Sequence, residues 1–85
     1  MSKFDEIEAM LAQLLAASRS ALTDDESAEV QRFIDVGEYG LALETAVDIY
    51  AEEKKIVTSE VAHLVERLAV AMALDVAQIS RKLSK

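Results

Sequence analysis

The chain contains no proline, and its only glycines are Gly37 and Gly40. Strands and hairpins are separated by turns rich in glycine and proline, so a chain with so few of these residues is a poor candidate for a sheet. Its apolar residues recur at spacings of three and four, which places them on one side of an α-helix. We therefore predict an all-α fold, a compact bundle of four to five short amphipathic helices in a single domain over residues 1–85.

Helix ends are indicated by residues that satisfy the free backbone groups there. The first three predicted helices cover residues 3–20, 24–36 and 40–54. The next begins after Thr58 or Ser59 and ends near residue 73, and the last covers residues 76–83. Thr23 with Glu26, and Asp75 with Gln78, have the spacing of a capping box. Gly37 is placed to end the second helix in the left-handed conformation. Ile56-Val57 is predicted to be a short extended link.

Each predicted helix carries an apolar stripe that is expected to face a common core. The fourth stripe is close to a heptad repeat, which also suits self-association. The expected inward residues are Phe4, Ile7, Leu11, Leu14 and Leu15; Val30, Phe33 and Ile34; Leu43, Ala46, Val47 and Tyr50; and Val61, Leu64, Val65, Leu68 and Met72.

The net charge of −7 is concentrated in the middle of the chain. Residues 20–53 contain ten acidic residues and one basic residue, Arg32, whereas the part from residue 54 onward has six bases and three acids. Glu44, Asp48 and Glu52 are spaced by four, so they line one side of a helix and repel one another. Such a stripe fits either of two interpretations. It steers a cationic partner, or it is solvated surface that keeps a small protein soluble.

The sequence lacks most residue patterns on which catalysis and ligand binding depend. It has no cysteine and one histidine, so a cluster of cysteine or histidine metal ligands is excluded. His63 is interpreted as a structural or surface residue. There is no glycine-rich phosphate loop and no EF-hand pattern. The acidic surface would repel nucleic acid. We predict a protein that is not an enzyme and needs no cofactor or metal.

The segment Phe33-Ile34-Asp35-Val36-Gly37-Glu38-Tyr39-Gly40-Leu41-Ala42-Leu43-Glu44 resembles the helix–turn–helix signature of the MafI-type bacterial immunity proteins. In that family a Gly-Glu-Tyr/Pro-Gly turn precedes a Leu/Val-Ala-Leu-Glu helix. Tyr50-Ala51-Glu52-Glu53, Ile56-Val57-Thr58 and Leu68-Ala69 are similar to its continuation, so the resemblance covers roughly residues 30–74. The chain departs from the family at Met72-Ala73-Leu74-Asp75, where a Leu-Gly-Leu-Asp type of turn is expected.

The resemblance implies an immunity protein that binds a cognate secreted toxin domain in the cytoplasm. Such proteins are encoded beside polymorphic toxins, including those of contact-dependent growth inhibition, and the toxins are often nucleases, commonly RNases. A basic nuclease would pair with acidic surface on the second and third helices. The expected binding residues are Glu38, Tyr39, Glu44, Asp48 and Glu52, with Asp24, Asp25 and Glu29 as a second patch.

Two other functions fit parts of the sequence. The heptad stripe of the fourth helix suits a homodimeric interaction or regulatory module without enzymatic activity. Small size, acidity and helicity suit a carrier protein, which needs an exposed serine for its prosthetic group in a setting such as Asp-Ser-Leu. Ser27 and Ser59 lie in Glu26-Ser27-Ala28 and Thr58-Ser59-Glu60, and neither matches. Tyr39 has an alternative role as well, packing over the helix junction.

No apolar run approaches the roughly 20 residues that a membrane span requires, and the first residues are acidic where a signal peptide is basic. We therefore expect a cytoplasmic protein.

Overall fold

The computed structural model describes residues 2–84, and over this range it contains five α-helices and no strand. The helices are α1 (Lys3–Ala17), α2 (Asp24–Asp35), α3 (Tyr39–Glu52), α4 (Ser59–Ala71) and α5 (Val76–Leu83). The predicted all-α fold is confirmed. The link at Ile56 and Val57 is outside any helix, as expected.

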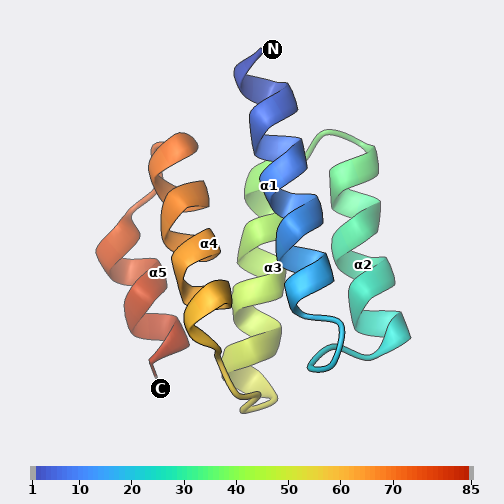
Figure 1. Cartoon of the computed structure of the whole chain (residues 1–85), viewed down its shortest axis with the longest axis vertical. Coiled ribbons are helices and arrows are strands. Elements are labelled where there is room, and N and C mark those ends of the chain that lie inside the picture. The colour runs from blue at the N-terminus through green and yellow to red at the C-terminus, as the bar shows by residue number, and fades with distance from the viewer. Residues whose placement is uncertain (1, 85) are drawn as a thin grey trace.

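Helix α3 occupies the centre of the bundle and packs against each of the other four helices. α2 and α5 lie on either side of it and do not touch each other, while α1 and α4 pack together (Figure 1). The α2–α3 turn, the start of α1 and the end of α4 lie at one end of the bundle. The link between α3 and α4 and the C-terminus lie at the other (Figure 1).

One apolar core joins all five helices. α3 contributes Ala42, Leu43, Ala46, Val47 and Tyr50, the largest share of any helix together with α4. The remaining buried residues are Ile7, Leu11, Leu14, Leu22, Val30, Ile34, Val61, Leu64, Val65, Leu68, Ala69 and Ile79. Most of the predicted inward residues are therefore buried, and Met10, Leu15, Phe33 and Met72 are half-buried around them.

Side chains cap the starts of four helices, whereas α3 begins after Glu38 without a side-chain cap. The Thr23 hydroxyl accepts from the Glu26 backbone N–H at 3.1 Å, and the Thr23 N–H donates to the Glu26 carboxylate at 2.9 Å, which confirms that capping box. Thr58 caps α4, and Asp75 accepts from the Gln78 N–H at 3.0 Å to start α5. Ser2 and Asp5 form a further capping box that was not predicted.

Three helices end in the same way, with a residue in the left-handed conformation and a backbone bond across the last turn. Gly37 has φ +78° after α2, as predicted. Lys54 (φ 51°) follows α3 and Ala73 (φ 56°) follows α4. Helices α3 and α4 therefore stop at Glu52 and Ala71, two residues earlier than the predictions of residues 54 and 73.

The first helix also ends earlier than predicted, at Ala17 and not at residue 20. Ser18 turns inward and is buried, and its hydroxyl accepts a 2.7 Å hydrogen bond from the Tyr50 hydroxyl. Its backbone oxygen accepts from the N–H groups of Ala21 and Leu22, which forms a turn in place of a further helical turn. This turn carries Leu22 into the core.

The prediction that Phe4 is a core residue is wrong, because its side chain is 68% exposed. The first turn of α1 extends beyond the neighbouring ends of α2 and α4 (Figure 1), so no helix covers this part of its apolar stripe. The Phe4 ring instead lies beside Tyr39, with ring centroids 6.4 Å apart.

The heptad-like stripe of α4 is part of the core of one chain. Val61, Leu64, Val65 and Leu68 are all buried against other helices. A homodimer could not use this stripe without opening the bundle, which corrects the expectation that the stripe offers a dimer surface.

Replacing Ala73 with glycine should stabilise the protein by about 0.5–1 kcal/mol, because a Cβ is strained at positive φ and glycine is not. Urea unfolding at an unchanged m-value measures this difference. The matched control is Ala28→Gly on the exposed face of α2, where the same change should cost about 1 kcal/mol. Equal destabilisation by both substitutions would show that residue 73 is not left-handed in solution.

Candidate protein-binding surface

The predicted binding residues fall in three places. Asp24, Asp25 and Glu29 are exposed in the first turns of α2, at the end of the bundle opposite the α2–α3 turn (Figure 1). Glu38 and Tyr39 are in that turn and at the start of α3. The other three, Glu44, Asp48 and Glu52, follow one another along α3.

The carboxylates along α3 are partly neutralised by α5. Lys82 Nζ lies 2.9 Å from the Asp48 carboxylate. The hydrogen bond and charge of Asp48, with smaller contributions from Glu44 and Glu52, raise the pKa of Lys82 above its ordinary value. The basic end of the chain thus supplies the cation that the stripe lacks within its own helix. Glu44 and Glu52 remain exposed.

The acidic start of α2 has one internal partner. Lys55 Nζ lies 2.9 Å from the Glu26 carboxylate, and both side chains are largely covered. The Thr23 backbone N–H, followed by Lys55, lowers the pKa of Glu26. Asp24, Asp25 and Glu29 are exposed beside this pair.

Tyr39 is held against α1. Its hydroxyl donates a 2.7 Å hydrogen bond to Glu8, and its half-buried ring lies beside Phe4. The bond to Glu8, burial, and the charges of Glu8 and Asp5 raise the pKa of Tyr39 above its ordinary value of 10.0. These contacts give Tyr39 the packing role over the helix junction, and its ring edge lines a surface hollow at the same time.

Most of the carboxylates on the acidic surface form no ion pair within the described chain. Within residues 2–84 the structure contains two ion pairs, Lys55–Glu26 and Lys82–Asp48. Of the seven predicted carboxylates, only Asp48 takes part in one of them. The other six are exposed, so this surface attracts a cationic partner and repels an anionic one.

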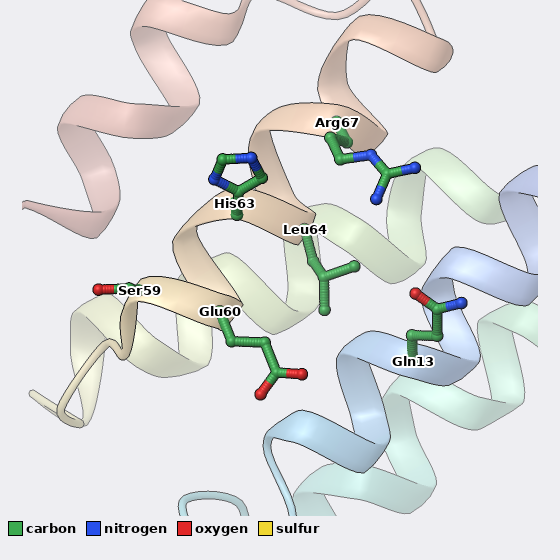
Figure 2. A pocket seen from close by; sticks show the side chains of 6 residues that line it. All are labelled: Gln13, Ser59, Glu60, His63, Leu64 and Arg67. Atoms are coloured by element: carbon green, nitrogen blue, oxygen red, sulfur yellow. The ribbon is translucent and has the colours of Figure 1, made fainter.

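The residues around His63 are not arranged as in a catalytic site. His63 is exposed and lines an open hollow of about 450 Å³ between α1 and α4, with Gln13, Ser59, Glu60, Leu64 and Arg67. Figure 2 shows the Ser59 side chain pointing away from both Glu60 and His63, so the three do not form a nucleophile, base and orienting acid. In the described part of the chain, no three histidine, aspartate or glutamate side chains are grouped to hold a metal ion.

No protein-family model, curated protein or solved structure matches the chain. Among the helices described here, none has the length and apolar character needed to cross a membrane.

The bond from Tyr39 to Glu8 predicts a tyrosine titration that depends on the Glu8 charge. Glu8→Gln keeps an acceptor but removes the charge, so the pKa of Tyr39 should fall toward 10.0. Tyrosinate absorbance of the wild type and the variant measures this shift, and Tyr50, present in both proteins, cancels from the difference. Coincident titration curves would contradict the contact.

The same bond has a consequence for stability at high pH. A tyrosine pKa that is raised by folding stabilises the protein below the ordinary value of 10.0, and this contribution is lost as the pH rises through it toward the folded value. The stability that this bond contributes in the wild type should therefore decline above that pH.

Proposed function

We propose that this protein is a cytoplasmic immunity protein that binds a cognate secreted toxin domain, a basic nuclease, through the acidic surface of α2 and α3. The observation that carries the proposal is the set of six exposed carboxylates outside the two ion pairs: Asp24, Asp25, Glu29, Glu38, Glu44 and Glu52. The resemblance of residues 30–74 to the MafI-type immunity proteins supports it independently.

The physical basis is charge complementarity with a phosphate-binding enzyme. A nuclease site holds its substrate with lysine and arginine residues, so a dense carboxylate surface is attracted to the same place. Opposite charges raise the association rate, and this gain falls steeply as salt is added. Contact with the basic site excludes the nucleic acid by occupancy and by charge.

A direct test is to express the toxin domain encoded beside this gene with and without the protein. Cells that express the toxin domain should grow again when they also express the protein. An equimolar amount of the protein should inhibit cleavage of RNA and DNA by the purified toxin domain. A toxin domain that neither binds the protein nor loses activity would refute the proposal. Sedimentation of the protein alone tests the homodimeric alternative.

Neutralising the α3 surface should weaken the complex. The double substitution Glu44→Gln and Glu52→Gln leaves the Lys82–Asp48 pair in place, so the packing of α5 is kept. We expect about a three- to tenfold rise in Kd, mostly through slower association, and a weaker dependence on salt. Stopped-flow kinetics at several salt concentrations measures both quantities.

The control for this variant removes the same charge elsewhere. Glu60→Gln with Glu66→Gln changes two exposed carboxylates of α4. This protein should keep nearly the wild-type Kd. Similar loss of binding in both double variants would assign the effect to net charge and would contradict an interface on α3.

A further inference from the structure

Most of the exposed large apolar residues belong to segments at one end of the molecule. Four of the five lie in or beside helix ends that meet where α1 begins (Figure 1). The fifth, Ile56, is in the link between α3 and α4 at the opposite end. The four are Phe4 in the first turn of α1, Val36 after α2, Leu41 in the first turn of α3 and Val70 in the last turn of α4.

A surface hollow of about 400 Å³ lies at this end. Its apolar lining comes from the overhanging start of α1 and from the turn between α4 and α5. These residues are Phe4, Ile7, Ala71, Met72 and Leu74. We call this feature the α1 hollow. Phe4, at 68% exposure, is the part of it most open to a partner.

Three carboxylates lie in or beside the α1 hollow. Glu38 lines it from the α2–α3 turn, and Glu8 lies beside it, bound to the Tyr39 hydroxyl at 2.7 Å. Asp5 is exposed in the same turn of α1 as Phe4. Lys3 balances Glu38 among the residues that line the hollow, and the two carboxylates beside Tyr39, Asp5 and Glu8, make its surroundings acidic.

We propose that the α1 hollow binds a basic protein segment in which an exposed apolar side chain is flanked by lysine or arginine. The apolar side chain packs against Phe4 and Met72, and the cations lie against Asp5, Glu8 and Glu38. The segment belongs to the toxin domain, and in this respect the inference rests on the proposed function. An apolar contact within a charged edge is the arrangement in which a few residues dominate binding energy.

Charge argues against two other occupants. A second copy of this chain would bring another molecule of net charge −7 and the same acidic surroundings to the contact, so the two would repel. An anionic membrane surface would be repelled by the same carboxylates. A cationic protein segment satisfies both the apolar lining and the acidic surroundings.

The hollow is tested without the toxin by titrating ¹⁵N-labelled protein with an amphipathic helical peptide of leucine and lysine. The largest amide shifts should occur at the start of α1, the α2–α3 turn and residues 71–74, with smaller shifts along the carboxylates of α2 and α3, which also attract lysine. Phe4→Ala should abolish the shifts at the hollow, whereas Ile56→Ala, the exposed apolar residue at the other end, should leave them unchanged. Absence of shifts at the hollow, or the same shifts with a leucine–glutamate peptide, would overturn the proposal.

The same two variants separate this inference from the proposed function once a toxin complex is formed. Phe4→Ala should raise the Kd about tenfold or more, and Ile56→Ala less than about twofold. Because Phe4 is exposed, its removal should leave the urea midpoint unchanged. If Phe4→Ala leaves the Kd of the toxin complex unchanged, the hollow is not part of the interface. The proposed function would not be contradicted by that result. If the protein alone forms a dimer that dissociates on Phe4→Ala, the hollow binds a second copy of the chain. That result would also overturn the proposal that it binds a toxin segment.

Discussion

Every other helix depends on the apolar sides of α3, because the bundle has no other element that touches all of them. Its buried residues form a wide stripe that three or more neighbours are needed to cover. Tyr50 extends this stripe with a polar bond, since its hydroxyl reaches Ser18 in the covered turn after α1. A buried hydroxyl left without this partner would cost about 1–3 kcal/mol, so the bond favours one position of α1 relative to α3.

Covering α3 in this way determines where its charges lie. Glu44, Asp48 and Glu52 lie on the side of α3 that the core leaves uncovered, next to Lys82 of α5. Their mutual repulsion is offset by Lys82 from α5, a helix that packs on the core through the buried Ile79 and the half-buried Val76 and Leu83. The acidic stripe and the basic end of the chain therefore form one arrangement, in which the surface remains acidic while α5 is held in place.

Local signals in the sequence predicted the fold well, but they did not predict contacts between residues far apart in the chain. The cap at Thr23 and the stop at Gly37 were identified because each depends on a few neighbouring residues. The left-handed conformation of Lys54 and Ala73 was not identified, so the predicted ends of α3 and α4 were two residues too late. These side chains tolerate that conformation only when packing holds them there. Tyr39–Glu8 and Asp48–Lys82 join residues far apart in the chain, and no periodicity within one helix indicates them. Seven of the eight predicted binding residues are acidic and the eighth is Tyr39, but their division among three places depends on the packing of the helices.

In the proposed toxin complex, the exposed Phe4 and the carboxylates would have different roles. Carboxylates spread over α2 and α3 attract a basic partner from a distance, but each exposed pair contributes little to the lifetime of a complex. An apolar contact acts only at short range and slows dissociation. The hollow that offers this contact combines residues 37–40 and 71–74, within the stretch that resembles the immunity proteins, with Phe4 and Ile7, which lie outside it. Changes at the start of α1 would therefore alter which partner is retained while the acidic surface and the central helix stay the same.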